Sequence, residues 1–337
     1  MSGGDDERDG VRLTNLDQPL FDGAEATKRD LVDYLDALHE RMLAELRGRP
    51  LTVQRVLRGQ QPFMQKNLPK YAPSWIPTVR LWAETSKREV AYPLCDDRRT
   101  LLWFANQRAV EYHPTLVRAD GWQYPTHLVL DLDPPRPDAF GQVVRAARLV
   151  RQALAAAGLD GAVKTSGAKG VHVFVPLEPD VPADDVAAAT RALAARAERI
   201  DPAVATTAFI RADRADKVFL DSTRAGGATV VAAYSPRARP GTPVSFPVAW
   251  DDLDDVDPAE FTLRTALARL GDEDPWAERM PAPQRLGSDL VEEGHAIPVA
   301  RVQAMHEGKR RARARRAAEA EAEAEAEPEA VAETETT

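Results

Sequence analysis

The feature that most constrains the fold is the segment His127–Ala233, in which short apolar runs alternate with two alanine-rich stretches. Short apolar and β-branched runs between turn residues favour strands, whereas apolar residues at helical spacing over longer stretches favour helices. Strands interleaved with helices are typical of a mixed α/β (α+β) domain. The pattern predicts helices near 138–157 and 183–199 and strands over His127–Leu132, Ala162–Lys164, Val171–Val175, Val218–Leu220 and Thr229–Ala233.

The rest of the 337-residue chain is predicted to add helices and loops to this one large domain. Apolar residues at helical spacing predict a helix from Thr27, as N-cap, to Leu46, and Gly48 and Pro50 follow it as stop signals. We also expect an ordered loop over 59–77 and a helix over 98–110. The predicted regions are a disordered N-terminus (1–10), the main domain (11–280), a linker with a helix around 298–308 (281–308) and a low-complexity basic-then-acidic tail (309–337).

Charge and cysteine content exclude several classes of protein. The formal net charge is −9, but Lys309–Arg316 carries six positive charges and Ala317–Thr337 carries eight negative ones, so residues 1–308 carry −7. A mildly acidic body argues against indiscriminate nucleic-acid binding and leaves a local basic groove open. Cys95 is the only cysteine, which excludes a disulfide scaffold and a cysteine-rich metal centre. We find no membrane-spanning stretch or signal peptide and expect a cytoplasmic protein.

The motif HLVLDLDPP (127–135) carries the strongest chemical signal. Alternate side chains of a strand share a face, so Asp131 and Asp133 are expected to point the same way, ~7 Å apart at Cα. Pro134 ends the strand and leaves both carboxylates at its edge. Facing carboxylates repel unless a cation lies between them, and Mg²⁺ and Mn²⁺ prefer oxygen ligands. The motif predicts a divalent-metal site, although an acidic strand end solvated at a turn would have the same sequence.

The motif VKTSGAKGVHVFVPL (163–177) joins two predicted strands through a glycine-containing turn. Gly167 and Gly170 allow the backbone to approach an anion, while Ser166 and Lys169 can donate to phosphate oxygens. It is not a P-loop, because a strand follows it and the glycine spacing differs. His172 lies on the face of the returning strand opposite its valines. A simple hairpin turn with a structural histidine is the alternative reading.

The segment 217–241 carries a third carboxylate and a pair of arginines. Asp221 ends a predicted strand as Asp133 does. Arg237 and Arg239 lie two residues apart between Pro236 and Pro240, whose fixed φ stiffens the segment. Stiff arginines suit bidentate recognition of phosphate, although a solvated basic turn would also carry them.

Together these motifs supply what phosphoryl or nucleotidyl transfer needs: carboxylates to hold two metal ions, and cations to absorb the charge of a polyphosphate. The sequence has no Gly-x-Ser-x-Gly elbow, no HExxH motif and no GxGxxG fingerprint. A hydrolase triad and nicotinamide chemistry are therefore poorly supported.

The motifs, in this order, resemble the polymerase domain of bacterial ligase D, a member of the archaeo-eukaryotic primase superfamily. The resemblance covers about residues 11–270 and rests on LTNLD (13–17), FMQKNLP (63–69), EYHP (111–114), HLVLDLDPP, TSGAKGVHV (165–173), FLD (219–221), AAYSPRARPG (232–241) and AWDDL (249–253).

This resemblance implies a primase-polymerase fold, with an RNA-recognition-like sheet forming the catalytic cleft between flanking helices. It also implies template-dependent nucleotidyl transfer to a primer 3′-hydroxyl by a two-metal mechanism with Mn²⁺ or Mg²⁺. The substrates would be nucleoside triphosphates, with a preference for ribonucleotides, used at DNA gaps or break ends during repair by non-homologous end joining.

Residue by residue, the resemblance implies two groups of contacts. Metal-binding catalytic residues would be Asp131, Asp133 and Asp221. Contacts to the incoming nucleotide would come from Ser166, Gly167, Lys169, His172, Arg237 and His113.

A pocket for a DNA 5′-phosphate is implied by the match of Asn15, Lys28 and Lys66 to family positions. Gln18 stands where a lysine is expected, which removes one cation from that pocket. Gln54 likewise replaces a basic residue beside the nucleotide, and STRAGG (222–227) departs from the family's polar and aromatic residues.

The chain carries no Lys-x-Asp-Gly ligase motif, so the resemblance implies a stand-alone member associated with the nucleoid. Its expected partners are gapped or broken DNA, a separate DNA ligase and an end-binding protein, with no membrane. The basic run Lys309–Arg316 would add non-specific DNA affinity or pair with the glutamates that follow it. Two alternatives are a catalytically weak DNA-end or nucleotide-binding repair module, which Gln18 favours, and a two-metal nuclease.

Overall fold

The computed structural model describes residues 6–83, 87–225, 228–299 and 305. The larger of its two parts is built on a six-stranded sheet in the order β11-β12-β8-β10-β9-β13. Neighbouring strands are antiparallel except for the parallel pair β11 and β12. The strands are β8 (His127–Asp133), β9 (Ala162–Thr165), β10 (Val171–Pro176), β11 (Ala205–Thr206), β12 (Val218–Asp221) and β13 (Pro247–Val248).

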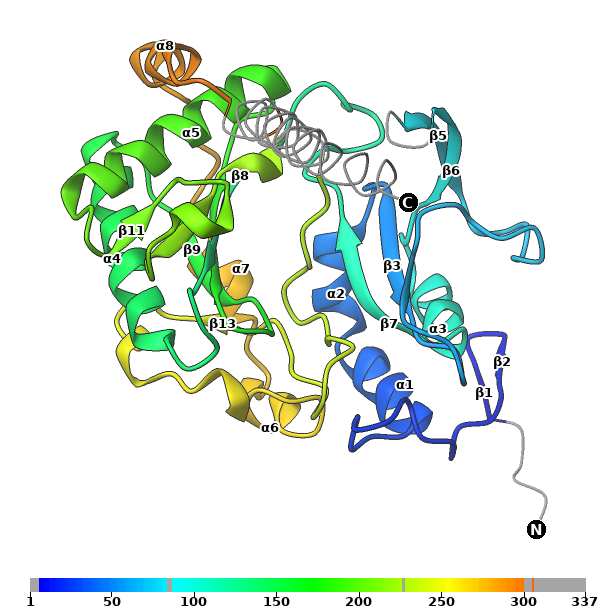
Figure 1. Ribbon diagram of the computed structural model, residues 1–337. Coiled ribbons are helices and arrows are strands. Elements are labelled where there is room, and N and C mark those ends of the chain that lie inside the picture. Colours follow the sequence, from blue (N-terminus) through cyan, green and yellow to red (C-terminus); the bar gives the residue numbers. More distant parts are fainter. Residues whose placement is uncertain (1–5, 84–86, 226–227, 300–304, 306–337) are drawn as a thin grey trace, which may run out of the picture.

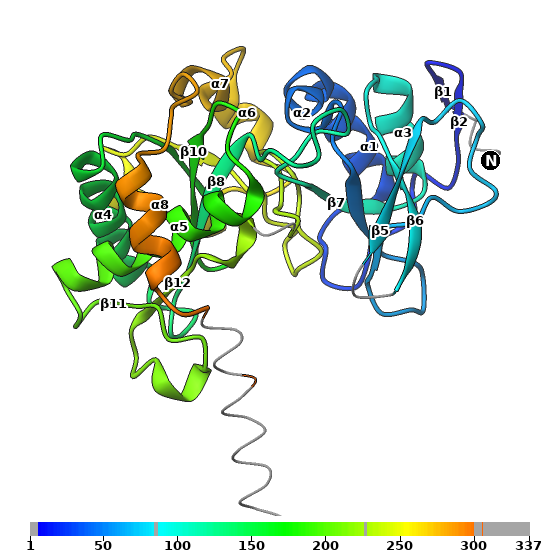
Figure 2. The same cartoon turned by 90° about the horizontal axis from the view of Figure 1, so that it is seen from above.

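Two long helices, α4 (Phe140–Ala156) and α5 (Ala183–Ile200), pack against each other and against β8. Helix α8 (Ser288–Ala296) lies along α5, and Figure 2 shows the three helices together on one side of the sheet. Alanines make up much of the buried face of both α4 and α5. The result is one layer of helix against one layer of strand.

The smaller part holds the sheet β4-β3-β7 and lies beside the first (Figure 1). One continuous cluster of buried apolar side chains runs through both parts. The strands are β3 (Leu51–Arg55), β4 (Phe63–Gln65) and β7 (Ala109–Pro114), and the helices are α1 (Lys28–Ala37), α2 (His39–Leu46) and α3 (Arg98–Asn106).

Two hairpins and several short helices complete the fold. The hairpins are β1 (Asp6–Arg8) with β2 (Val11–Leu13), and β5 (Thr78–Ala83) with β6 (Arg88–Pro93). The short helices are α6 (Ala266–Leu270), α7 (Pro275–Arg279) and the 3₁₀ turns η1 (Arg211–Asp213), η2 (Thr223–Ala225), η3 (Leu253–Asp255) and η4 (Pro258–Glu260).

Local sequence explains where the first helix begins and why the prediction 27–46 is divided. Thr27 and Asp30 form a capping box, in which each side chain accepts from the other's backbone N–H and so satisfies donors that the helix cannot. Leu38 then leaves helical geometry, with φ −100° and ψ 12°. The segment is therefore the two helices α1 and α2 rather than one.

Other expectations also need correction. The predicted loop 59–77 contains strand β4, and the predicted helix 98–110 ends at Asn106. Residues 6–10 belong to the β1-β2 hairpin, so the predicted disorder of 1–10 is wrong for them. Residues 229–233 are not a regular strand, although Val230 and Ala232 donate to β7 carbonyls and join the two parts. The predicted linker contains an unexpected helix, α8, over Ser288–Ala296. The predicted helix around 298–308 stays untested, because most of that segment and the whole tail 309–337 lie outside the described residues. No helix in the described part of the chain could span a membrane.

Candidate active site

Sheet register brings four polar residues of distant sequence into one row across the larger sheet. Asp131 of β8 lies directly opposite Asp221 of β12 on one side and His172 of β10 on the other. His172 in turn lies opposite Lys164 of β9. Directly opposed residues of neighbouring strands share a face and lie within side-chain contact. The row therefore places two carboxylates, an imidazole and an ammonium side by side.

Both carboxylates of the row are held by donors from the protein. Asp131 is 8% exposed, and its Oδ1 lies 3.3 Å from His172 Nε2. Arg224 Nη2 lies 2.8 Å from Asp131 Oδ2 and 3.2 Å from Asp221 Oδ2. Burial alone would raise the pKa of Asp131, but His172 and Arg224 outweigh it and hold that pKa well below its usual range. Asp131 is thus ionised in the folded protein.

Asp133 lies two residues further along β8 and is in a different state. Its side chain has no hydrogen bond or ion pair within the described chain, and it reaches a pocket of about 380 Å³. Partial burial, together with repulsion from Asp131 and Asp221, raises the pKa of Asp133 to about 6. Desolvation is the larger of these causes, and the repulsion adds to it because Asp133 lies close to two other carboxylates.

The chemistry of this donor set suits a hard divalent cation, because it consists of carboxylate oxygens at one sheet edge. As the side chains stand, however, no group of three potential ligands in the described residues is arranged to hold a metal. The place between Asp131 and Asp221 is taken by the guanidinium of Arg224. The residue types that we predicted therefore lie together, and a cation from the chain itself lies among them.

The row continues from His172 into a buried lysine. Lys164 is fully buried, and its Nζ lies 2.9 Å from His172 Nδ1 and 2.5 Å from Ser245 Oγ. Burial, and next the charge of Arg237, lower the pKa of Lys164 to about 7. Burial and the nearby Lys164 lower the pKa of His172 to about 4. A lysine that donates to Nδ1 leaves Nε2 to carry the proton toward Asp131.

The turn between β9 and β10 brings backbone and side-chain donors to the same edge. Ser166 Oγ accepts the backbone N–H of Ala168 and of Gly170, each at 3.2 Å. Gly167 has φ +65°, and a Cβ there would lie 2.7 Å from Arg237 Cγ. Only glycine fits such a position, since it needs both a left-handed backbone and the space of the missing side chain.

Lys169, at the tip of the turn, is exposed and lines the same pocket as Asp133. Arg211 and Arg214 of the loop before β12 line it as well. Arg214 lies against the Phe219 ring, 3.7 Å from its centroid, and this contact fixes the arginine over the strand. Sequence reasoning missed both arginines, because their loop shows no periodic pattern.

Glu111 connects the two parts of the protein at the site. Its Oε2 accepts from Arg237 Nε at 2.9 Å and lies 2.8 Å from His113 Nε2, while Oε1 accepts the N–H of Ala238. Burial alone would raise the pKa of Glu111, yet His113 and Arg237 lower it overall. The predicted residues His113 and Arg237 are therefore neighbours, and Glu111, within the motif EYHP, positions both.

The three residues predicted for a 5′-phosphate do not form one contact group. Lys28 is 3% exposed, and its Nζ donates to Thr14 O at 2.5 Å and Asn106 Oδ1 at 2.7 Å. Asn15 and Lys66 are exposed, and no hydrogen bond or ion pair within the described chain joins any two of the three. Gln18 lines a pocket of about 530 Å³ that Arg58 and Arg108 also reach. The 5′-phosphate role of Asn15, Lys28 and Lys66 stays a prediction.

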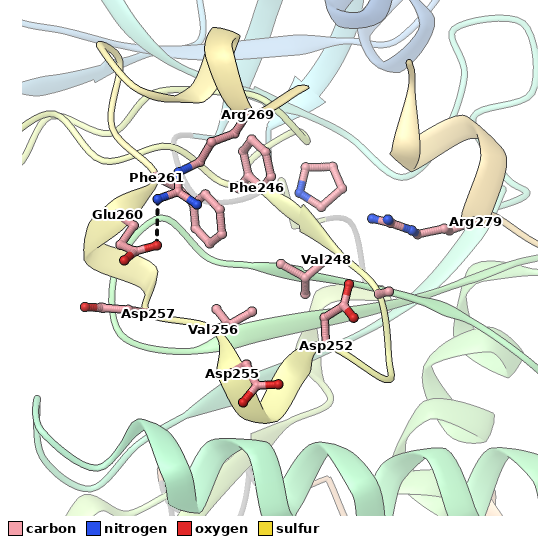
Figure 3. Close-up of a pocket in the computed structure, with 12 residues that line it drawn as sticks. Phe246, Val248, Asp252, Asp255, Val256, Asp257, Glu260, Phe261, Arg269 and Arg279 are labelled. Atoms are coloured by element: carbon pink, nitrogen blue, oxygen red, sulfur yellow. Dashed lines mark hydrogen bonds and ion pairs between the residues drawn. The ribbon is translucent and has the colours of Figure 1, made fainter. Parts of the chain in front are cut away.

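A third pocket lies beside β13, at the opposite end of the strand order from β12 (Figure 3). Phe246 and Phe261 stack in it with ring centroids 4.2 Å apart, and Arg269 forms a 2.7 Å ion pair with Glu260. Its volume is about 280 Å³, and none of the residues predicted for the site lines it. The candidate active site is therefore the row of polar residues on β12, β8 and β10.

Comparisons with known proteins show which family the chain is similar to. The family model described as LigD, primase-polymerase domain, matches residues 27–276. The multifunctional non-homologous end joining DNA repair protein LigD of Mycobacterium tuberculosis (strain H37Rv) is 34% identical over 283 residues, which cover 81% of this chain and 37% of that protein. The bifunctional non-homologous end joining protein LigD of Bacillus subtilis is 31% identical over 265 residues, 77% of this chain and 42% of that protein.

A solved structure is similar as well. The polymerase domain from Mycobacterium tuberculosis ligase D in complex with DNA superposes with a TM-score of 0.74 at 34% identity, covering 80% of this chain and 97% of that one. The curated relatives are longer, and this chain spans well under half of their length.

Proposed function

The chain belongs to the LigD primase-polymerase family of nucleotidyltransferases, and on that premise we propose that it extends a primer 3′-hydroxyl on a DNA template at gaps or break ends. The substrates we propose are nucleoside triphosphates, ribonucleotides in preference, and the pathway is repair by non-homologous end joining. One observation carries the proposal: the row Asp221–Asp131–His172 lies at the same sheet edge as the Ser166 turn and Arg237.

In this proposal Asp131, Asp133 and Asp221 hold Mn²⁺ or Mg²⁺. A bound divalent cation supplies charge that lowers the pKa of a primer hydroxyl and offsets the charge of the departing pyrophosphate. The raised pKa of Asp133 supports this role, because a carboxylate that resists ionisation among like charges gains most from a cation.

The triphosphate would bind to the turn and its neighbours. Ser166, Gly167 and Lys169 offer donors at the tip, and Arg237 offers a planar guanidinium that Glu111 already orients. His113 is held by the same glutamate. His172 receives a hydrogen bond from Lys164 on one side and faces Asp131 on the other. These two contacts hold the imidazole in place, so His172 would orient the Asp131 carboxylate.

The partner we propose is DNA with a gap or a broken end, together with a separate DNA ligase and an end-binding protein. Support for DNA comes from the similar polymerase domain, which is described in complex with DNA. The exposed cations Lys169 and Arg211 beside the carboxylates give that edge positive charge within an otherwise acidic protein.

The test is extension of a labelled primer on a short gapped duplex, with each ribo- and deoxynucleoside triphosphate and with Mn²⁺ or Mg²⁺. We expect extension that the double variant Asp131→Ala/Asp133→Ala abolishes. A matched acidic pair elsewhere, Asp252→Ala/Asp255→Ala, should leave extension unchanged. Binding of the same duplex without extension under any condition would instead make the protein a catalytically weak DNA-end or nucleotide-binding module.

A further inference from the structure

The position of Arg224 among the carboxylates has a consequence for metal binding. Arg224 lies in η2, directly after β12, and a single nitrogen, Nη2, bridges Asp131 and Asp221 at 2.8 and 3.2 Å. The turn itself is tied to the same site, because Thr223 donates to Asp221 Oδ1 from both its N–H, at 2.8 Å, and its hydroxyl, at 2.6 Å. Arg224 therefore lies near the carboxylates because its turn directly follows β12, the strand that carries Asp221.

These contacts use every oxygen of the two carboxylates. Asp131 Oδ1 faces His172 and Oδ2 accepts from Arg224. Asp221 Oδ1 accepts from Thr223, and Oδ2 faces Arg224. A divalent cation bridging Asp131 and Asp221 would have to lie where the guanidinium lies, and two cations in contact repel strongly in a partly buried site.

The guanidinium is also able to leave. Its side chain is 33% exposed, so it has a path to solvent, whereas the carboxylates are 11% and 10% exposed. Arg224 Nε is buried and has no hydrogen-bond partner in the described chain. A buried donor without a partner costs free energy that a pose turned toward water would recover. Within the described residues, the hydrogen bond and ion pairs of the Arg224 side chain go to these two carboxylates.

We propose that Arg224 is an internal counter-ion that a divalent cation must displace from Asp131 and Asp221. In the metal-free protein it neutralises the repelling carboxylates, and it thereby lowers the affinity of the site for metal. The inference rests on the proposed function in one respect, that these carboxylates are metal ligands.

The test is titration of the full chain with Mn²⁺ alone, without nucleotide or DNA, followed by calorimetry or by the electron paramagnetic resonance signal of free Mn²⁺. Arg224→Gln removes the charge and should tighten Mn²⁺ binding about tenfold or more, because one charge-assisted hydrogen bond and one ion pair no longer have to be broken. Arg224→Lys keeps the charge and should stay close to the wild type. The melting temperature of metal-free Arg224→Gln should fall, and Mn²⁺ should raise it by more than in the wild type.

Arg214→Gln is the matched control. Arg214 lines the pocket of Asp133, but its hydrogen bonds go to Ala208 O and Phe209 O rather than to the carboxylates. Its removal changes the field at the site without freeing a carboxylate oxygen, so Mn²⁺ affinity should change by less than in Arg224→Gln.

The outcomes separate this inference from the proposed function. Wild-type protein that binds Mn²⁺, with Arg224→Gln binding equally or more weakly, overturns the counter-ion role and leaves the metal site intact. Protein that binds no Mn²⁺ with either arginine or glutamine at 224 overturns both. A gain in affinity that Asp131→Asn cancels supports the inference at the predicted carboxylates.

Discussion

Two regions of this protein are dense in aspartate, and they differ in almost every physical respect. The first is the trio Asp131, Asp133 and Asp221 on the neighbouring strands β8 and β12. The second is the run DDLDDVD (251–257), which passes through η3. In the trio, strand alternation and register bring the carboxylates close together on one face of the sheet, and two of the three are buried. In the run, adjacent residues diverge, and every aspartate is exposed.

The partners differ as well. Asp131 and Asp221 share Arg224, which is itself two-thirds shielded. The run uses separate surface arginines: Asp254 pairs with Arg148 of α4 at 2.6 Å, and Asp251 with Arg151 at 3.5 Å. Density of negative charge therefore does not mark the site. Convergence does, because desolvation and then repulsion from the neighbouring Asp131 and Asp221 together raise the pKa of Asp133 to about 6, whereas the exposed aspartates of the run face separate arginines.

The largest predicted difference is in catalysis. Asp133→Asn should lower the rate of primer extension about a hundredfold to a thousandfold, since it removes a charged group from the reacting centre. Asp252→Asn, in the run, makes the same chemical change at an exposed position and should leave the rate within twofold of the wild type. Steady-state rates of the two variants, measured beside their melting curves, make the comparison. Equal rates for both would mean that convergence has no functional meaning.

Much of the larger sheet could be predicted from the sequence. Four of its strands and both long helices lie within about two residues of the predicted bounds, because alternating and helical periodicities are strong where one face is buried. The predictions failed where structure depends on distant partners. Residues 229–233 pair irregularly with β7, and residues 6–10 form a hairpin whose Arg8 bonds to Asp36 of α1 at 3.0 Å.

The site shows the same division. The spacing of Asp131 and Asp133 predicted that both side chains share a face of one strand. Sequence alone does not give the register in which that strand pairs with its neighbours. The contacts of Asp131 with His172 and Asp221 could not be derived from spacing. Lys164, Glu111 and Arg224 were missed altogether. All three lie within quoted motifs or segments, namely 163–177, EYHP and STRAGG. Lys164 lies directly opposite His172, so pairing those two strands in register would have found it.

The second prediction concerns a buried cation at the site, and it expects an effect on the free energy of unfolding that is smaller than the catalytic one. Lys164 in the row is fully buried, and its pKa is lowered from 10.5 to about 7 by burial and then by Arg237. The unfolded chain therefore binds more protons than the folded one between pH 7 and 10.5, so the free energy of unfolding should rise with pH across that window. From pH 7 to pH 9 this contribution is about 2 kcal/mol.

Lys164→Met should flatten that rise, which urea unfolding at pH 7 and pH 9 measures directly. Lys28 is a control of the same kind, since burial and then Arg108 lower its pKa to about 8, and Lys28→Met should remove a smaller part of the rise. The lowered pKa of Lys164 would be contradicted if the free energy of unfolding of the wild type did not rise between these pH values. It would also be contradicted if that free energy rose as steeply in Lys164→Met as in the wild type.

The smallest effect is expected in the acidic run, where Arg148 and Asp254 have side chains that are 31% and 67% exposed. A double-mutant cycle with Arg148→Ala and Asp254→Ala should give a coupling of about 0.2–1 kcal/mol, because water and salt screen exposed pairs and ordering the long arginine side chain costs entropy. The coupling should shrink further in 1 M salt, where the Debye length is about 3 Å. A salt-insensitive coupling above about 2 kcal/mol would mean that the run is as convergent and as shielded as the trio. The two regions would then differ only in their neighbours, because the trio lies beside the Ser166 turn and Arg237 and the run does not. In that case the nearby phosphate-binding groups, and not the geometry of the carboxylates, would distinguish an active site from an acidic surface.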